Sequence, residues 1–396
     1  MSTLISVTVT GETSLQGYLA IDATVNGRSY GGVRMASDFS PDSLARAARA
    51  KTLKYGLLGL PVGGAKAGIA ADPEMPTAMK LEVLRNFGQA LKPMLQTGSF
   101  VPSDDLGTTN DDIRHMLNSI GLKVQPRTLT DRSSGFYTGI TVCAAAVRAA
   151  QHIGLDLNRA SVAVEGFGSV GSSTAYLLGK HGIKVVAVST IHGAVYDEAG
   201  LDIDELLRLR DRAGNQAVSL YPGGEKIEKG GIAELDVDIF SPCAQSDSIT
   251  SNNAGRVAAR IICPGANAPI TPDAEPVLFQ RGILSIPDFA ANCGGALGVS
   301  MKRTGLKEAY IRRFLEQGIG ARIGEIIETA DKENVSLRTF AEGVAEERFL
   351  RAKAVAERGN FVSRSFNLGL ELYRRGIIPH QLVTPIAPWY FKRKAR

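Results

Sequence analysis

The chain has 396 residues and a formal net charge of +5, from 45 Lys and Arg against 40 Asp and Glu. Its 44% of hydrophobic residues is enough to form at least one large core, which excludes disorder as a description of the whole chain. The length predicts roughly two to three domains. The 43 glycines, about 11% of the chain against a usual share of roughly 7%, gather in short clusters and show no collagen repeat.

Several classes of protein are not indicated. The cysteines and histidines show none of the spacings of a disulfide framework or a metal site, so we expect no metal. No basic and apolar leader begins the chain and no apolar run approaches roughly 18 residues, so we expect a cytoplasmic protein without a membrane partner. The basic tail at 392–396 has no aromatic and basic platform beside it, so we expect a solvated end and no nucleic-acid partner.

In the first part of the chain, residue spacing predicts two strands and two helices. Alternation over residues 3–10 predicts a strand, and residues 18–22 resemble a second one. Ser40, followed by proline, is a good N-cap and predicts a helix that runs to about Tyr55. Residues 80–95 have the apolar spacing of an amphipathic helix.

Two lysines stand at the ends of a glycine-rich segment, Lys54 and Lys66. Lys51 lies one helical turn before Lys54, on the same face of the predicted helix. We expect Lys66 to lie in a glycine-rich turn with few side chains to solvate it, so enclosure would lower its pKa and suit it to acid–base chemistry near neutral pH. A surface lysine in a flexible loop is the alternative interpretation.

A pair of carboxylates follows, Asp104 and Asp105, beside a Gly-Thr-Thr turn. A carboxylate in this position is a candidate general base. The pair is equally compatible with the start of a helix at 110–113, for which Thr109 or Asn110 is a plausible N-cap.

The second half of the chain alternates short apolar runs with helical patterns, which predicts an α/β fold with a parallel, doubly wound sheet. A helical pattern follows Gly295 and is clearest over 337–355. A break near 130–136 separates the two styles. We expect a first α/β domain at 1–133, a dinucleotide-binding domain of the Rossmann type at 134–344, and a C-terminal helical segment at 345–396 that packs back on the first domain. The predicted strands of the second domain are 161–164, 184–188, 237–240, 260–262 and 283–286.

A dinucleotide fingerprint stands between the first two of these strands. Gly166, Gly168 and Gly171 follow an apolar strand and open a helix, with Ser169 and Val170 in its first turn. In such a motif the glycines form the turn, admit the pyrophosphate and let the helix pack on the strand. A tight strand-to-helix turn without a ligand is the alternative.

The acidic residue that usually binds the ribose hydroxyl of NAD is missing. About 20 residues after the fingerprint, where it is expected, the chain has Thr190. The choice between NAD and NADP therefore stays open.

Taken together, the motifs resemble those of the glutamate/leucine/phenylalanine/valine dehydrogenase family over most of the chain. The matching segments are 31–35, 54–68, 105–108, 166–171, 242–244, 265–272 and 287–295.

The resemblance implies a substrate-binding domain followed by a Rossmann domain, with the active site in the cleft between them. It assigns Lys54 to the substrate α-carboxylate. Lys66 becomes the lysine that activates water, and Asp105 the group that exchanges protons with the substrate nitrogen. Thr138 and Asn292 are expected near the nicotinamide of NAD or NADP.

Further expectations follow from the same resemblance. Ala244 and Asn267 are expected along the cofactor groove. The first domain is expected to build a homo-oligomer.

The substrate side chain is predicted from two positions. Glutamate-specific members have a Lys at the place of Tyr30 and a Ser at the place of Val299, where this chain resembles the leucine and phenylalanine types. Without a cation, the γ-carboxylate of glutamate would be buried unpaired. We therefore expect an apolar substrate, branched-chain or aromatic, in a pocket that Gly32 and Gly64 also border.

Alternatives stay open. They are a glutamate dehydrogenase, a nucleotide-binding relative without catalysis, and the same chemistry run toward amino-acid synthesis. The chain also departs from the family pattern at Ala67, Thr141 and Thr190.

The glycine clusters divide along these lines. Those at 63–64, 166–171 and 294–295 are predicted to face ligands, and the pair at 31–32 to border the substrate pocket. The pairs at 223–224 and 230–231 are expected to be ordinary loop glycines.

Overall fold

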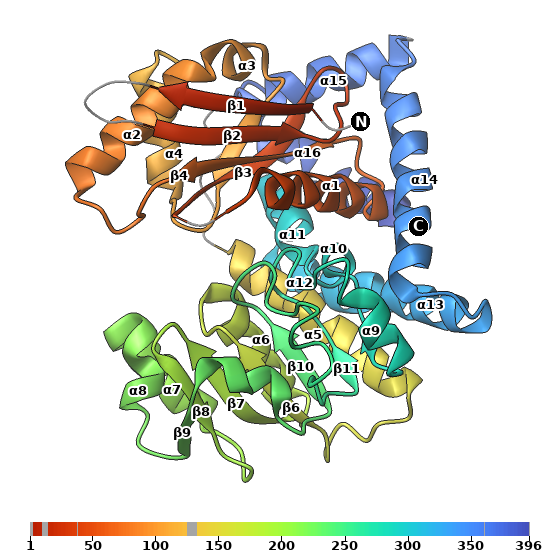
Figure 1. Cartoon of the computed structure of the whole chain (residues 1–396). Helices are drawn as coiled ribbons and strands as arrows, with labels where there is room; N and C mark the ends of the chain where they lie inside the picture. The colour runs from red at the N-terminus through yellow and green to blue at the C-terminus, as the bar shows by residue number, and fades with distance from the viewer. Residues whose placement is uncertain (1–2, 10–14, 38, 125–132, 360, 396) are drawn as a thin grey trace. The chain divides into compact units, whose positions relative to one another are not determined.

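The computed structural model describes residues 3–9, 15–37, 39–124, 133–359 and 361–395. Its contacts divide the chain into two compact units (Figure 1). Unit 1 comprises residues 1–131 and 344–394, and unit 2 comprises residues 132–343. Residues 130–132 of the predicted break at 130–136 lie outside the described residues. Both units combine a sheet with helices, which confirms the predicted α/β fold.

Unit 1 contains a five-stranded mixed sheet with the strand order β1-β2-β4-β3-β5. β2 is antiparallel to both of its neighbours, β1 and β4, whereas β3 runs parallel to both β4 and β5. The predicted strands at 3–10 and 18–22 are confirmed by β1 and β2. The strands are β1 (Thr3–Val9), β2 (Leu15–Ile21), β3 (Ser29–Ala36), β4 (Gly63–Ala70) and β5 (Val101–Asp104).

The two faces of this sheet differ. Val33, Met35 and Ala67 point into the main core, together with Phe87 of α2 (Thr77–Ala90) and Met116 of α4 (Asn110–Ser119). Because side chains alternate along a strand, the residues between them face the other side, which α1 (Pro41–Leu57) covers over β2 and β4. The predicted cap of α1 is confirmed, since the Ser40 side chain accepts a hydrogen bond from the backbone N–H of Ser43.

The single helix predicted at 80–95 is wrong. The structure has α2 (Thr77–Ala90) and α3 (Lys92–Thr97), separated at Leu91. The proline at position 93 has no backbone N–H to donate and its ring crowds the preceding turn, so α2 cannot continue through it. The predicted cap at Thr109 is confirmed, because it begins α4 (Asn110–Ser119) with a capping box.

The C-terminal helices belong to unit 1 from residue 344 onward. They are α14 (Leu337–Glu357), which begins in unit 2, α15 (Phe361–Arg374), α16 (His380–Val383) and α17 (Ala387–Ala395). The basic tail is not a free end over its described part. Residues 392–395 lie in α17, whose Phe391 is buried, and the backbone oxygen of Lys394 accepts a hydrogen bond from Arg348 at 2.7 Å. Arg396 lies outside the described residues.

Unit 2 contains a seven-stranded sheet with the order β12-β11-β10-β6-β7-β8-β9. The first five of these strands are parallel, as predicted, whereas β8 and β9 are antiparallel and were not predicted. The strands are β6 (Ser161–Glu165), β7 (Lys184–Thr190), β8 (Gly193–Tyr196), β9 (Glu225–Ile227), β10 (Ile239–Pro242), β11 (Ile261–Ile262) and β12 (Leu284–Ser285).

The chain leaves β6 toward β7 and later returns to the other side of β6 with β10, so the strand order reverses at β6. Ligands of open parallel sheets bind outside the carboxyl ends of the strands at such a point. The central helix is α5 (Ser134–His152), which packs on α6 and α11. The helical segments of unit 2 are α5, α6 (Ser169–Lys180), α7 (Ile203–Ala213), η1 (Gly214–Gln216), α8 (Ala217–Leu220), η2 (Lys229–Glu234), α9 (Glu275–Gln280), α10 (Asp288–Ala291), α11 (Gly294–Arg303), α12 (Glu308–Arg313), the π-helical η3 (Phe314–Ile319) and α13 (Gly320–Lys332).

None of the helices in the described part of the chain is long and apolar enough to cross a membrane.

Candidate active site

A buried ionic cluster lies in unit 1, on the face of the sheet that α1 partly covers. The ammonium group of Lys66 in β4 lies 2.6 Å from Oδ2 of Asp105, and Nε of Arg34 in β3 donates to the same oxygen at 3.1 Å. The side chain of Lys66 is only 7% exposed, that of Asp105 17% and that of Arg34 13%. The structure therefore brings together Lys66 and Asp105, which the sequence analysis had singled out separately.

Strand pairing explains why these groups meet. β3 lies between β4 and β5, and Gly32 pairs with Ser103 of β5, so the chain that leaves β5 passes over Gly32. A Cβ atom at Gly32 would lie 2.8 Å from Cβ of Asp105. Gly32 therefore makes room for the carboxylate, which is a local reason for glycine at this predicted substrate residue.

The loop after β5 is fixed to β3. The Thr108 hydroxyl donates to the backbone oxygen of Val33 at 2.7 Å and accepts from the backbone N–H of Asp105 at 3.1 Å. These bonds hold the Asp105 carboxylate against Lys66. Asp104, the other member of the predicted pair, ends β5 and is exposed, so the two carboxylates do not act as one pair.

The prediction that Lys66 lies in a turn is wrong. Lys66 is in the middle of β4, between buried alanines at 65 and 67. The glycines around it made the segment resemble a turn, but here they serve packing. A Cβ atom at Gly64 would lie 2.5 Å from the backbone oxygen of Ala48 in α1.

α1, which packs against β4, contains two further lysines. Lys54 in α1 is 6% exposed. Lys51, one turn earlier, lies over the ring of Tyr55 with its ammonium group 5.6 Å from the ring centre. Burial lowers the pKa of Lys51, against the attraction of Asp105 and Asp104.

Burial and neighbouring charges set the protonation of the cluster. For Lys66, burial and the nearby Arg34 lower the pKa, Asp105 opposes them, and the result is about 8. For Asp105, burial raises the pKa, but Lys66 and Arg34 outweigh it and lower the pKa to about 2. Near neutral pH the carboxylate is thus ionised, while the lysine is close to the point at which it exchanges its proton.

The sequence analysis missed Arg34 and left Lys51 without a role. The signal for Arg34 is that it lies two residues after Gly32, on the same face of a strand. That signal was not visible because β3 itself was not predicted. Tyr30 precedes Gly32 by two residues and so also belongs to this face of β3. Val299 lies in α11 of unit 2 and is partly buried.

In unit 2, the fingerprint connects β6 to α6, and its three glycines have different surroundings. Gly166 has a φ of +86°, which favours glycine. A Cβ atom at Gly171 would overlap the backbone oxygen of Gly166, so α6 packs directly on the turn. A Cβ atom at Gly168 would meet nothing within 4 Å.

Gly168 is thus the one of the three that neither backbone conformation nor packing explains. It is the N-cap of α6 and supplies no side-chain cap, and Ser169 beside it is exposed, with Val170 partly buried behind it. The start of this helix is open to an anion, as the pyrophosphate of a dinucleotide requires.

Thr190 ends β7, but its hydroxyl is occupied by the protein. It donates to the backbone oxygen of Asn215 at 2.8 Å and accepts from the backbone N–H of His192 at 3.2 Å. Thr190 therefore offers no carboxylate that would select NAD over NADP at the end of β7.

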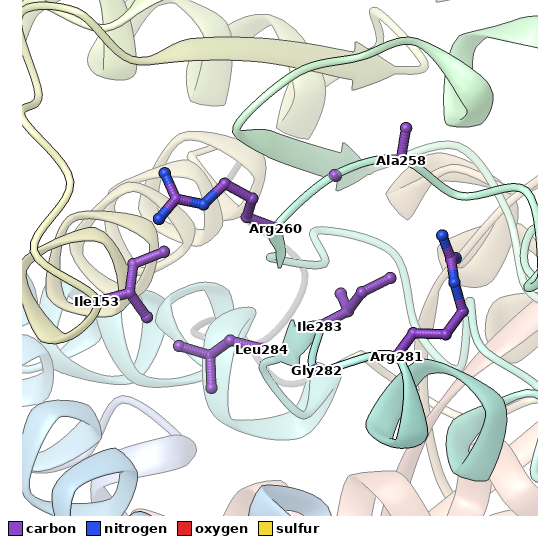
Figure 2. Close-up of a pocket in the computed structure, with 8 residues that line it drawn as sticks. Ile153, Ala258, Arg260, Arg281, Gly282, Ile283 and Leu284 are labelled. Carbon is purple, nitrogen blue, oxygen red and sulfur yellow. The ribbon is translucent and has the colours of Figure 1, made fainter.

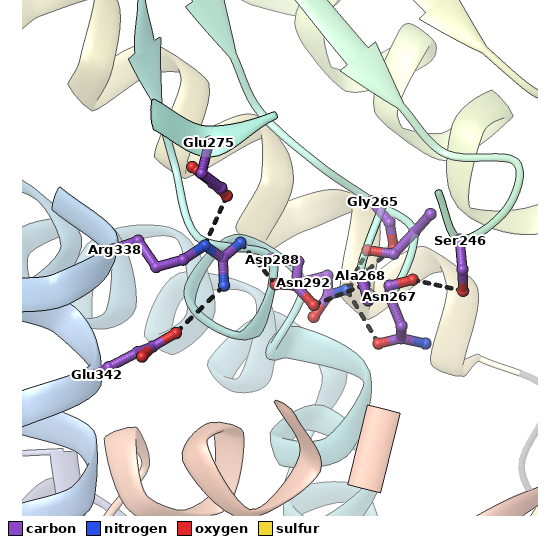
Figure 3. A network of polar contacts seen from close by, with 10 residues as sticks. Ser246, Gly265, Asn267, Ala268, Glu275, Asp288, Asn292, Arg338 and Glu342 are labelled. Carbon is purple, nitrogen blue, oxygen red and sulfur yellow. Dashed lines mark hydrogen bonds and ion pairs between the residues drawn. The ribbon is translucent and has the colours of Figure 1, made fainter. Parts of the chain in front are cut away.

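The other predicted cofactor residues follow the remaining parallel strands at the same edge of the sheet. Ala244 follows β10 and lies against Gly166, Asn267 follows β11, and Asn292 follows β12. The Asn292 side-chain amide donates to the backbone oxygen of Ala266 at 2.8 Å and to Oδ1 of Asn267 at 3.2 Å (Figure 3).

Thr138 is in α5, where its hydroxyl donates to the backbone oxygen of Ser134 at 2.9 Å. A Cβ atom at Gly295 would lie 2.6 Å from this hydroxyl, and one at Gly294 would overlap the backbone oxygen of Tyr137. At positions 63–64 and 294–295, a Cβ atom would meet neighbouring protein atoms, which gives a packing reason for these glycines. Their predicted ligand-facing role stays a prediction.

A pocket of about 280 Å³ lies elsewhere in unit 2 (Figure 2). Its lining comes from Ile153, from residues 258–260 before β11, and from residues 281–284 at the start of β12. These are the amino ends of the parallel strands, opposite the edge that holds the fingerprint. Within the described ranges, no group of three or more His, Cys, Asp or Glu side chains is placed to hold a metal ion.

Comparison with known proteins gives the context for both units. Residues 133–359 match the family model "Glutamate/Leucine/Phenylalanine/Valine dehydrogenase", and residues 3–121 match "Glu/Leu/Phe/Val dehydrogenase, dimerisation domain". The chain is 32% identical over 364 residues to a glutamate dehydrogenase of Thermotoga maritima, covering 87% of this chain and 86% of that protein. It is also 32% identical over 326 residues to the NAD-specific glutamate dehydrogenase of Staphylococcus aureus, covering 79% and 78%.

Among solved structures, the chain resembles the hetero-hexameric glutamate dehydrogenase of Thermus thermophilus in its Leu-bound form. The TM-score is 0.75 at 25% identity, over 91% of this chain and 90% of that one. The two family models together span most of the chain, in the order in which the ionic cluster and the fingerprint occur. The chain belongs to the Glutamate/Leucine/Phenylalanine/Valine dehydrogenase family.

Proposed function

We propose that this protein catalyses the reversible, NAD(P)-dependent oxidative deamination of an L-amino acid to the 2-oxo acid and ammonia. The observation that carries the proposal is the Lys66–Asp105 contact of 2.6 Å, with Lys66 at a pKa of about 8. Such a pair suits a reaction in which water is deprotonated and a nitrogen exchanges protons near neutral pH.

The reaction balances as follows. The amino-acid Cα loses a hydride and its nitrogen loses a proton, which gives an imino acid. Water then adds to the imino carbon, and ammonia leaves as the carbonyl forms. A nicotinamide cofactor, when bound, accepts the hydride.

Lys66 and Asp105 have separate roles in this scheme. Neutral Lys66 accepts a proton from the attacking water, and in its ammonium form it stabilises the negative charge that develops beside Cα. Asp105, ionised because its pKa is about 2, accepts hydrogen bonds from the substrate nitrogen and exchanges protons with it. Lys54, buried on α1, is the proposed partner of the α-carboxylate.

The residues of unit 2 fit a nicotinamide dinucleotide. The open position at Gly168 and the uncapped start of α6 suit the pyrophosphate. Oδ1 of Asn292 is buried and accepts no hydrogen bond from the described residues, so it can take an amide N–H, which the carboxamide of the nicotinamide presents. Because Thr190 provides no carboxylate that would select NAD, we propose NAD or NADP as the cofactor, and both have to be assayed.

For the substrate, we propose an apolar side chain, branched or aromatic. Tyr30 belongs to the same face of β3 as Arg34 and offers a ring where a lysine would pair with a γ-carboxylate. A buried carboxylate without a cation would cost several kcal/mol, about 3–5 when one partner of a buried pair is missing.

An acidic substrate is the second candidate, and Lys51 favours it. Its ammonium group is close enough to Asp105 and Asp104 for their charges to act on its pKa. The charges of Lys51 and Arg34 both act on the pKa of Lys66, so three cations lie in this region. The named relatives are also glutamate dehydrogenases.

The test is a panel of L-amino acids assayed for NADH and NADPH formation. We expect turnover with leucine, valine or phenylalanine to exceed turnover with glutamate. A preference for glutamate would select the second candidate. Cofactor binding without turnover on any amino acid would contradict the proposal and indicate a nucleotide-binding relative without catalysis. We further propose a homo-oligomer, on the match of residues 3–121 to a dimerisation domain, which light scattering tests.

A further inference from the structure

A buried ionic network in unit 2 has no role in the function described so far (Figure 3). Arg338, in the first turn of α14, donates from Nε to Oε1 of Glu275 at 2.6 Å and from Nη2 to Oδ1 of Asp288 at 3.2 Å. Its Nη1 lies 3.5 Å from Oε1 of Glu342. One guanidinium is thus shared by three carboxylates, and Asp288 is only 1% exposed.

Asp288 connects Arg338 to the loop that follows β11. Its other oxygen, Oδ2, accepts a hydrogen bond from the backbone N–H of Ala268 at 2.9 Å. Ala268 has a φ of +48°, a conformation that a residue with a Cβ atom rarely adopts. Its backbone oxygen also accepts from the N–H of Asp247 at 2.9 Å. Such a conformation persists only where the surroundings hold it from several sides, and Asp288 is one of them.

The same network reaches Asn292, the proposed partner of the cofactor carboxamide. The backbone N–H of Asn292 donates to the backbone oxygen of Asp288 at 2.9 Å. Its side-chain amide then bonds to the loop at Ala266 and at Asn267, which fixes the direction of its unpaired Oδ1. Asn292 and the loop are therefore both held to Asp288.

Stability alone is a weak reason for such an arrangement. Burying a guanidinium and carboxylates removes them from water, and replacing a buried ion pair with apolar groups is often neutral or stabilising. What an ion pair of this kind supplies is a fixed direction, because the planar guanidinium holds its partners at set angles. Here the guanidinium fixes the orientation of Asp288, which in turn holds a strained loop beside the proposed cofactor site.

We propose that Arg338 is a positioning residue for the nicotinamide cofactor: through Asp288 it sets the conformation of the 265–268 loop and the orientation of Asn292. Arg338 does not itself touch the cofactor. This inference rests on the proposed function, since it needs a dinucleotide at the edge of the sheet that carries Asn292.

The test compares Arg338→Lys with a matched control, Arg281→Lys. Lysine keeps the charge at 338 but has no planar fork to hold Glu275 and Asp288 at once. Arg281 is exposed, and it donates to the backbone oxygens of Ala254 and Val257, at the edge of the sheet opposite the fingerprint. NADH and NADPH are titrated against the full-length variants by fluorescence, and Tm is measured for each.

For Arg338→Lys we expect the cofactor Kd and KM to rise about tenfold or more, because a displaced positioning group commonly costs one to two orders of magnitude. The amino-acid KM stays within about twofold. Arg281→Lys lowers Tm with an unchanged cofactor Kd. If Arg338→Lys does not fold, Asp288→Asn replaces it, with the same expectation.

A third variant separates charge from geometry. Glu275→Gln keeps an acceptor for Nε of Arg338, so the cofactor Kd should stay within about threefold. A lowered Tm in Arg338→Lys with unchanged cofactor Kd would show that the network is only structural and overturn the inference. If the unmodified protein binds neither NADH nor NADPH, the proposed function fails as well, so the two failures are distinguishable.

Discussion

The ionic cluster of unit 1 and the cofactor edge of unit 2 are built in opposite ways. In unit 1, two cations from separate strands, Arg34 of β3 and Lys66 of β4, contact the same oxygen of Asp105, which follows β5. In unit 2, the residues stand at the ends of parallel strands, and the central one, Gly168, contributes only the absence of a side chain. The first region holds charge and the second provides space and backbone groups.

This difference separates two kinds of dependence on the fold. The chemistry of Lys66 depends on neighbours that tune its pKa, so a change at any cation of the cluster should alter the pH dependence of the reaction. The binding role of the fingerprint depends on shape, so changes there should act on cofactor affinity and leave the pH dependence unchanged.

The largest effect is expected from Lys66→Met. Removing the ammonium group eliminates acid–base catalysis, so kcat should fall by about 10²- to 10⁴-fold while the Kd for NADH is unchanged. Steady-state kinetics and fluorescence titration measure the two quantities. Lys80→Met is the matched control, because Lys80 also forms an ion pair in unit 1, with Asp112 at 3.2 Å. Activity of Lys66→Met close to that of the unmodified protein would remove Lys66 from the mechanism.

A second comparison uses two glycines of the fingerprint. Gly168→Val places a side chain in open space, so Tm should be unchanged while the cofactor Kd rises about tenfold or more, since the pyrophosphate needs this backbone to be accessible. In Gly171→Ala, the added Cβ atom would overlap the backbone oxygen of Gly166, so this variant, unlike Gly168→Val, should have a lower Tm. If Gly168→Val binds the cofactor normally, the space at Gly168 is not the cofactor site.

A smaller effect is expected from Lys51→Met. With an apolar substrate, the ratio of kcat/KM for leucine to that for glutamate should change by less than about threefold, because Lys51 contributes only a general charge. If kcat/KM falls by about tenfold or more for glutamate alone, Lys51 binds a substrate carboxylate. The amino-acid panel repeated on this variant makes the measurement.

How much the sequence could predict also differs between the two regions. The fingerprint is local: strand, three glycines and helix follow one another within a short segment, so its position was predicted and its strand and helix are β6 and α6. The start of α1 was predicted for the same reason, since Ser40 and the following proline form a cap on their own.

The ionic cluster was predicted only in part. Glycine pairs interrupt the pattern in both strands, Gly31-Gly32 in β3 and Gly63-Gly64 in β4, and glycine is depleted in strands, so Lys66 was placed in a turn. Their strand conformation comes from pairing with β2 and β5 and from the contact with α1. Arg34 and Arg338 were missed because each acts on a carboxylate about 50 residues away or more, a distance over which spacing carries no signal.

The most direct test of the central claim is the pH profile of kcat/KM for oxidative deamination, compared between the unmodified protein and Arg34→Met. Lys66 has to be neutral to accept a proton, so the rate should rise with pH through about 8. The charge of Arg34 lowers the pKa of Lys66, so its removal should raise that pKa and move the rising limb to higher pH. The substrate amine titrates identically with both proteins and drops out of the comparison. A limb that stays in place, or moves to lower pH, would contradict the assignment of Lys66 as the group that exchanges the proton.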